Sequence, residues 1–401
     1  MKAYITLLKS HTLLRKLSLI QLIAYFGAWF SNVAIYTLLI SLHVSAEIVA
    51  FVAMLHFISG VVQAPLSGAI IDKIHPKKLM LTLISIEVIA TFSLLLVKDV
   101  SDLQLLYVLI FFKMAAASFY FTTEMSLLPK ILQDTSLQQA NELHSIIWSF
   151  SYTLGMAISG FVVYSLGIDI AFVLDGTMFI VAFFLLYSTE IKVALTKTES
   201  HLGLMMLETF SYLKSNTKAL HLMLIHAFVG VTAFDALVAL MVEQYYASVI
   251  ATSLALGLLH SSRAVGLVVG PIFLGKWMNN KRLIYIFIGQ GSAIWLWAYL
   301  MHNFYLSLVA SFFVGLFTTT LWSYSYTLLQ KNIEAKYYGR IVAYNDMMFL
   351  STAALTSFMI GYLSSHNISL ESVALLMGML FFMGALYYSL LLKYKNIKEI
   401  S

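Results

Sequence analysis

The chain has 401 residues, of which 60% are hydrophobic and 11% charged, and its mean hydropathy is +0.87. A water-soluble protein of this size could not cover so much apolar surface, because its exterior must be largely polar. The net charge of +5 is not gathered on one solvated segment, which argues against a nucleic-acid partner, and the lack of cysteine excludes disulfides and thiolate metal sites.

Apolar stretches long enough to span a bilayer recur along the whole chain. A spanning helix needs about 20 predominantly apolar residues. We count twelve such stretches, at residues 17–41, 45–67, 79–97, 103–126, 143–166, 169–189, 219–243, 248–274, 283–300, 303–328, 341–364 and 372–392. Residues 1–16 stay basic as far as Lys16 and no cleavage site follows them, so we expect a short amphipathic lead-in on the inner membrane face rather than a signal peptide.

The basic residues indicate the orientation, because cytoplasmic loops are enriched in Lys and Arg. With both termini inside, the inner segments contain all but three of the 24 basic residues. The exceptions are Lys98 in an outer loop and Lys113 and Arg263 within spans. This alternation predicts an even number of spans and two cytoplasmic termini. The expected location is a plasma membrane, specifically a bacterial inner membrane.

One long hydrophilic connection separates six spans from six. We therefore predict an N-terminal six-helix bundle at residues 1–189, a cytoplasmic linker at 190–218 and a C-terminal six-helix bundle at 219–401. The halves are weakly alike: Leu127-Leu128-Pro129-Lys130 follows the fourth span, and Leu328-Leu329-Gln330-Lys331 follows the tenth. Such similarity favours two parallel repeats related by an axis along the membrane normal.

The loop between the second and third spans reads GAIIDKIHPKK, residues 68–78. Gly68 allows close helix approach, Asp72 supplies a carboxylate, and Lys73, Lys77 and Lys78 mark the cytoplasmic side. The spacing resembles the G-x-x-x-D-[RK]-x-G-[RK]-[RK] gate loop of the major facilitator superfamily, with His-Pro where the second glycine is usual. An ordinary positively charged loop is the alternative interpretation.

Four further stretches sharpen this resemblance: LLPKILQDTSLQQANELHS at 127–145, GMAISG at 155–160, AFVLDGTMF at 171–179 and YYGRIVAYN at 337–345. The stretches at 127–145 and 171–179 resemble the macrolide-efflux and enterobactin-exporter-like branch of the superfamily. GMAISG resembles the antiporter signature of the fifth span, with Met156 in place of its proline and Ser159 in place of one glycine, and YYGRIVAYN resembles the entry to the eleventh span. The resemblance implies an all-α membrane protein with twelve helices in two pseudo-symmetric six-helix bundles. It also implies that Asp72 meets the start of the eleventh span beside Gly339 and Arg340. Where the branch often has Gly-Asp-Trp, this chain has Gly27-Ala28-Trp29.

Charged side chains within the predicted spans are candidate functional groups, because a charge at the bilayer centre costs about 3 kcal/mol or more. Glu124 and Lys113 lie about three turns apart on one face of the fourth span, which lines the central cavity in the resembled fold. We expect Glu124 to carry a proton and Lys113 to contact substrate or relay charge. The alternatives are an interfacial Glu124 in water and a structural bridge from Lys113 to Glu87 of the third span.

The second half offers Asp235 and His226 in the seventh span and Arg263 in the eighth. We expect them to serve proton coupling or substrate binding, with Arg263 nearer to His226 in depth than to Asp235. The alternative for Arg263 is a fixed bond to backbone carbonyls. The alternative for His226 is a structural role, because a lone histidine more often only has its hydrogen bonds satisfied within the protein. Asp175 on the sixth span, like Glu87, is expected to support packing rather than contact substrate.

Trp322 and Tyr326 lie four residues apart on the tenth span and could wall an apolar substrate pocket, although membrane-belt and core packing explains most aromatic residues here. The sequence contains no Walker loop, Rossmann glycine pattern, H-E-x-x-H or nucleophile elbow, so we expect no enzyme activity and no cofactor. Energy would then come from an ion gradient.

The sequence therefore predicts a secondary active transporter, surrounded by membrane lipid and working as a monomer. We expect it to export amphipathic or lipophilic small molecules, of drug or siderophore-like type, in exchange for protons by alternating access. Three alternatives stay open: proton-coupled uptake of a small solute, a lysolipid flippase, and a non-transporting membrane sensor.

Overall fold

The computed structural model describes residues 2–71, 73–132, 134–193, 211–334 and 338–394. All regular structure within these ranges is helical, and twelve segments are long and apolar enough to cross a membrane. The predicted all-α class and the twelve spans are thereby confirmed.

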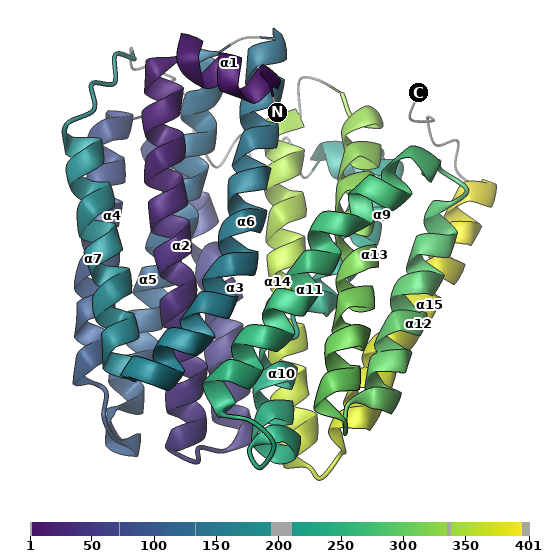
Figure 1. Ribbon diagram of the computed structural model, residues 1–401. Helices are drawn as coiled ribbons and strands as arrows, with labels where there is room; N and C mark the ends of the chain where they lie inside the picture. Colours follow the sequence, from purple (N-terminus) through teal and green to yellow (C-terminus); the bar gives the residue numbers. More distant parts are fainter. Residues whose placement is uncertain (1, 72, 133, 194–210, 335–337, 395–401) are drawn as a thin grey trace. The chain divides into compact units, whose positions relative to one another are not determined.

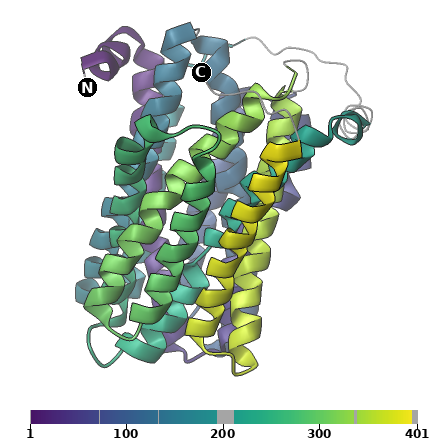
Figure 2. The same ribbon diagram turned by 90° about the vertical axis from the view of Figure 1, so that its right-hand side faces the viewer.

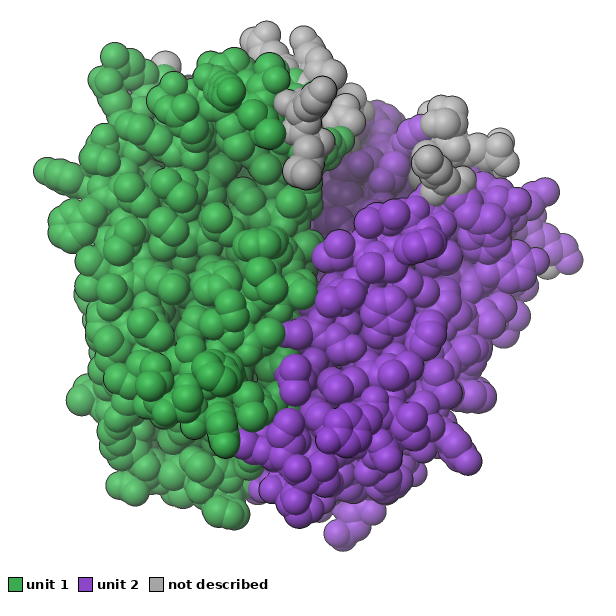
Figure 3. All heavy atoms as spheres, in the orientation of Figure 1, with its two compact units in different colours: residues 1–44, 59–198, 252–257 green, residues 45–58, 199–251, 258–401 purple. Residues whose placement is uncertain are grey.

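The chain forms two compact units, coloured separately in Figure 3. Unit 1 contains residues 1–44, 59–198 and 252–257, and unit 2 contains residues 45–58, 199–251 and 258–401. Two helices, α3 (Ala46–Ile71) and α11 (Thr252–Leu274), therefore contribute residues to both units. The domain limits at 189 and 218 stay a prediction.

Unit 1 is built mainly from five long helices, shown in Figure 1. They are α2 (Thr12–Ser41), α4 (Pro76–Ser93), α5 (Leu103–Ile131), α6 (Asp134–Leu166) and α7 (Ile168–Tyr187). Helix α2 packs against α6 and α7, while α4 packs against α5 and α7. Large apolar residues such as Phe161 and Phe184 stay exposed at 61% and 63%, as expected where hydrocarbon is the solvent.

The lead-in forms its own helix, α1 (Lys2–Ser10), which packs on the protein. Leu7 is buried in a cluster with Leu128, Leu132 and Ala140, and the Tyr4 hydroxyl donates to Glu142 Oε2 at 2.8 Å. This hydrogen bond raises the pKa of Tyr4 above its usual value. The apolar face predicted to lie on the membrane thus covers the junction of α5 and α6.

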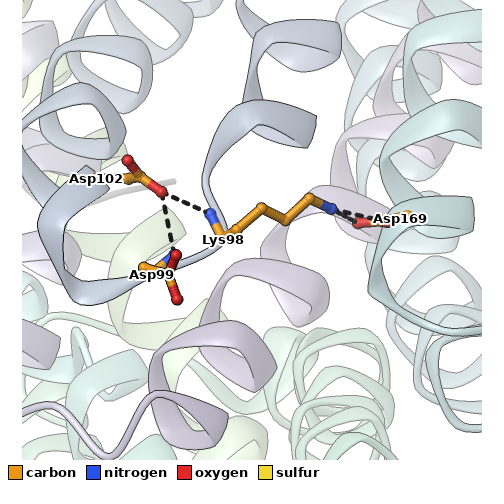
Figure 4. A network of polar contacts seen from close by, with 4 residues as sticks. All are labelled: Lys98, Asp99, Asp102 and Asp169. Atoms are coloured by element: carbon orange, nitrogen blue, oxygen red, sulfur yellow. Dashed lines mark hydrogen bonds and ion pairs between the residues drawn. The ribbon is translucent and has the colours of Figure 1, made fainter.

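Lys98, the lysine predicted to lie in an outer loop, forms an ion pair in unit 1, as Figure 4 shows. Lys98 Nζ lies 2.7 Å and 2.8 Å from the two carboxylate oxygens of Asp169, at the start of α7. Asp102 Oδ2 accepts from the backbone N–H groups of Lys98, at 2.9 Å, and Asp99, at 3.1 Å. These contacts fix the connection between α4 and α5 against α7. Because the ion pair is more than half exposed, it contributes about 1 kcal/mol at most.

Unit 2 contains the helices of the second half, seen from two sides in Figures 1 and 2. They are α9 (Thr217–Ala227), α10 (Asp235–Met241), most of α11, α12 (Leu283–Leu300), α13 (Phe304–Lys331), α14 (Tyr338–Ser365) and α15 (Leu370–Tyr394). Helix α12 packs against both α13 and α15, and α14 packs against α9 and the segment that follows it.

The seventh predicted span is broken rather than continuous. Helix α9 ends at Ala227, a 3-10 turn covers Phe228–Thr232, and α10 starts at Asp235 before a π-helical turn at Val242–Tyr246. A Cβ on Gly230 would lie 2.6 Å from the Phe349 carbonyl oxygen, so the irregular backbone packs directly on α14. The span is buried along most of its length, which is where a membrane protein tolerates non-helical backbone.

Helix α6 and the start of α11 approach each other backbone to backbone within unit 1. A Cβ on Gly160 would lie 2.6 Å from the Ser253 carbonyl oxygen, and a Cβ on Gly257 would lie 2.6 Å from that of Met156. Small residues at both positions therefore permit the contact, as they commonly do between membrane helices.

Candidate functional site

Four helices of unit 1 converge on a buried ion pair. Lys113 Nζ from α5 lies 2.5 Å from Asp175 Oδ2 of α7 and donates to Thr91 Oγ1 of α4 at 2.8 Å. Ser31 of α2 donates its hydroxyl to the same Asp175 oxygen. Both charged side chains are almost inaccessible, with 6% exposure for Lys113 and none for Asp175. The low accessibility makes each charge dependent on the other.

The structure corrects the predicted alternative that paired Lys113 with Glu87. The described ion partner of Lys113 is Asp175, while Glu87 of α4 is buried within electrostatic reach of both. A Cβ on Gly27 would lie 2.8 Å from Asp175 Oδ1. Asp175 thus occupies the space beside α2, and its contact is a charge pair rather than packing alone.

Glu124 presents a buried carboxylate of a different kind. Its side chain on α5 is 2% exposed, and its Oε2 atom has no hydrogen-bond partner among the described residues. The Tyr120 hydroxyl likewise has no hydrogen-bond partner among the described residues. Glu124 is within electrostatic reach of Tyr120 and of Tyr25 on α2. The predicted alternative of an interfacial carboxylate in water does not fit this burial.

A histidine that the sequence interpretation missed completes this cluster. His144 of α6 places Nε2 3.5 Å from the Tyr25 hydroxyl, and its ring centroid lies 5.2 Å from that of Phe121. Gln21 donates to the His144 carbonyl at 3.3 Å. The only sequence signal was a histidine at the edge of the predicted span 143–166. We name Glu124, Tyr25, Tyr120 and His144 the carboxylate cluster.

His226 of α9 lies at the centre of an aromatic box in unit 2. Its ring centroid lies 5.8 Å from that of Trp322, 5.4 Å from that of Tyr326 and 5.9 Å from that of Phe349. Trp322 and Tyr326 are stacked at 5.1 Å on α13. Sequence reasoning had marked the histidine and the two α13 aromatics separately, and the fold brings them together.

The polar contacts of the His226 ring favour one tautomer. His226 Nδ1 lies 2.8 Å from Ser325 Oγ, and the Ser325 hydroxyl also lies 2.7 Å from the Leu321 carbonyl oxygen. Because a hydroxyl carries one hydrogen, a bond from Ser325 to Leu321 leaves Nδ1–H to donate to Ser325. His226 Nε2 is then an acceptor, and it has no hydrogen-bond partner among the described residues.

Arg263 of α11 is bound to the break in the seventh span. Its Nη2 donates to the Thr232 carbonyl at 2.9 Å, and its guanidinium lies 5.0 Å from the centroid of the Phe234 ring. These contacts are adjacent to Asp235, so the expectation that Arg263 lies nearer to His226 is wrong. The helix break supplies the reason, because the Thr232 carbonyl there accepts from the Phe234 N–H in a tight turn and also accepts from the guanidinium. The predicted alternative, a fixed bond to a backbone carbonyl, is the contact observed.

Asp235 opens α10 and faces a second histidine. His260 Nε2 of α11 lies 3.8 Å from Asp235 Oδ1, and the His260 side chain is buried. Asp346 on α14 is a further carboxylate that the sequence interpretation overlooked, although it stands within the apolar stretch 341–364. It is half-buried and follows the fully buried Asn345.

The predicted gate is only partly visible. Asp72 lies outside the described residues, and so do the side chain of Arg340 and the surroundings of Gly68 and Gly339. Lys73 and Lys78 are exposed, while Lys77 Nζ donates to the Tyr187 carbonyl at 2.7 Å and so ties α4 to the end of α7. The assignment of a gate to these residues stays a prediction.

Comparison with known proteins identifies the architecture. The family model of the Major Facilitator Superfamily matches residues 17–256. The nucleoside transporter NupG has a similar solved structure, with a TM-score of 0.73 and 14% identity, covering 96% of this chain and 100% of that one. The structure of a mutant of that transporter has a TM-score of 0.74 and 13% identity, covering 94% of this chain and 99% of that one. The structure of a D-xylose-proton symporter has a TM-score of 0.75 and 10% identity, covering 96% of this chain and 98% of that one. No curated protein matches the sequence significantly.

Proposed function

Because the chain belongs to the major facilitator superfamily, we propose that it is a proton-coupled exporter of amphipathic or lipophilic small molecules that works by alternating access. The proposal includes a single working chain in a bacterial inner membrane with both termini in the cytoplasm. Its support comes from one buried acidic group in unit 1 and one aromatic box in unit 2.

The observation that carries the proposal is the burial of Glu124 without a polar partner at Oε2. An ionised carboxylate in such a place costs several kcal/mol, because no described group replaces the water that Oε2 has lost. A proton removes that cost. Any conformational change that admits water to the carboxylate cluster would therefore change its proton occupancy, and the reverse coupling follows by linkage.

The aromatic box suits the cargo. Trp322 and Tyr326 offer stacked flat faces, and Trp322 is 41% exposed. His226 Nε2 offers one buried acceptor beside them. A flat apolar molecule with one hydrogen-bond donor would match this combination of apolar wall and single polar group.

The contact of Arg263 with Thr232 supports a mechanical role. The guanidinium donates to the end of the 3-10 turn, and His260 lies within electrostatic reach of both Arg263 and Asp235. Broken spans are where transporters of several folds place their binding sites and their moving parts. We assign Arg263 to stabilising the broken backbone at Phe228–Thr232. We assign the pair of Asp235 and His260 to responding to changes of charge beside this break.

Glu124→Gln tests the coupling. The variant is compared with the wild type in proteoliposomes, with a panel of lipophilic fluorescent dyes as cargo and an imposed pH gradient. We expect gradient-driven accumulation to be lost while dye exchange without a gradient continues, because Gln cannot release a proton. Glu190→Gln, which changes an exposed carboxylate, is the matched control. A Glu124→Gln protein that still concentrates dye on a pH gradient would contradict the assignment.

A second candidate is proton-coupled uptake of a small polar solute. It is favoured by the solved neighbours, which include a nucleoside transporter and a D-xylose-proton symporter, although that likeness establishes the fold alone. The direction of net flux in vesicles of known sidedness separates the two. Uptake requires cargo and protons to move the same way, and export requires them to move in opposite ways.

A further inference from the structure

A basic groove runs along unit 1 between the start of α4 and the end of α7. Its volume is about 400 Å³. His75, Lys77 and Lys78 line it at the start of α4, and Leu81, Thr82, Ser85 and Phe183 line the rest, where the Thr82 and Ser85 hydroxyls donate to carbonyls of their own helix. Helices α4 and α7 lie side by side there, at the end of unit 1 that carries the amino terminus (Figure 1). The groove uses none of the residues assigned above to proton coupling or cargo binding.

The groove opens at the boundary of the apolar surface. On α7 the neighbouring side chains Phe184 and Tyr187 are 63% and 64% exposed, and Val181 is 44% exposed. On α4, Ile89 is 66% exposed. Such residues face hydrocarbon in a membrane protein, so a molecule in the groove would meet lipid tails along α7 and water at the lysines.

The polar end of the groove is prepared for an anion. Lys77 Nζ donates to the Tyr187 carbonyl at 2.7 Å and lies 5.6 Å from the centroid of the Tyr187 ring. This anchoring fixes one ammonium group and leaves two of its three donors for a ligand. Lys78 is exposed beside it, and no carboxylate is among the described residues that line the groove. The nearby acidic residue Glu190 lies 3.2 Å from Lys192, with which it forms an ion pair.

We propose that this groove binds one anionic phospholipid, with its phosphate at Lys77 and Lys78 and an acyl chain along Leu81 and Phe183. Two features favour a lipid over a soluble anion: the apolar side chains of Leu81 and Phe183 in the groove, and its continuity with the exposed apolar residues Phe184 and Tyr187 of α7. Basic pockets between spanning helices on the side of the basic loops are the usual places for such headgroups. The site shares Lys77 and Lys78 with the predicted gate loop, but its argument does not depend on the proposed transport function.

The test uses the purified full chain in a neutral detergent, titrated with phosphatidylglycerol, phosphatidylcholine or inorganic phosphate. Retained lipid is measured by native mass spectrometry, and the thermal unfolding midpoint is followed in parallel. We expect phosphatidylglycerol to be retained and to raise the midpoint, with phosphatidylcholine and phosphate much less effective. Lys78→Gln should weaken phosphatidylglycerol retention about fivefold, and Lys77→Gln/Lys78→Gln should weaken it further.

The controls separate this site from general surface charge. Because Lys77 also ties α4 to α7, the single variant Lys78→Gln provides the readout that leaves this contact in place. Lys9→Gln/Lys130→Gln removes the same charge as the double variant from exposed lysines outside the groove. Equal losses in the two double variants would overturn the proposal. So would equal retention of the two lipids by the wild type, or protection by inorganic phosphate equal to that by phosphatidylglycerol.

Discussion

At the residue scale, Lys113 is the buried cation whose loss should have the largest effect on folding. Lys113→Met removes the described ion partner of the buried Asp175, which should lower the free energy of unfolding by about 3–5 kcal/mol. The double variant Lys113→Met/Asp175→Asn should recover much of that loss, since no unpaired charge remains. Thermal unfolding in detergent measures both, and Lys98→Met, which breaks the exposed pair with Asp169, should change little. A double variant no more stable than the single one would contradict this account.

His226 should act on cargo affinity rather than on turnover. His226→Phe keeps the aromatic box but removes the Nε2 acceptor, so we expect KM for a dye that carries a donor group to rise about tenfold with kcat little changed. A dye without a donor should be affected far less. The exposed His366→Phe is the control. An equal effect on both dyes would show that the histidine acts through packing alone.

At the element scale, the broken seventh span should depend on Arg263. Arg263→Gln loses the charged hydrogen bond to the Thr232 carbonyl and should destabilise unit 2 by about 1.5–3 kcal/mol. Arg282→Gln is the matched control. Arg282 also donates to a backbone carbonyl, that of Trp277, and lies over the Trp277 ring, but at an exposed site. Hydrogen exchange at residues 228–236 reports the change directly. Unchanged protection of these amide groups from exchange in Arg263→Gln would show that the broken segment is stable without the guanidinium.

The close contact of α6 with α11 gives a second test at this scale. Gly160→Val would push a side chain into the Ser253 carbonyl and separate the two helices. We expect a lower unfolding temperature and impaired transport together. Gly275→Val is the control, because a Cβ there meets nothing within 4 Å. Transport and stability equal to those of the control would show that α6 and α11 do not need this approach.

How far the sequence could predict these features depends on what physically determines each one. The twelve spans were predictable, because the bilayer requires about 20 apolar residues for each of them. The ion partner of Lys113 could not be predicted, because it depends on how α5 and α7 are rotated against each other. The break at Phe228–Thr232 was hidden because its residues are as apolar as those of a continuous helix. His144 and Asp346 were missed because each is a single polar residue whose surroundings only packing reveals.

At the scale of the whole molecule, unit 1 contains the carboxylate cluster and unit 2 contains the aromatic box. Two helices, α3 and α11, contribute residues to both units, so neither unit can rearrange without affecting those helices. Membership of the superfamily establishes a transporter fold, and the coupling of cargo to protons is the central claim that goes beyond it.

The most direct test of that claim is the internal pH of sealed proteoliposomes, followed with a trapped pH-sensitive dye after a lipophilic substrate is added. We predict a substrate-dependent pH change that needs the protein, disappears in Glu124→Gln and persists in Glu190→Gln. Substrate movement through the protein with no accompanying proton movement would contradict the account.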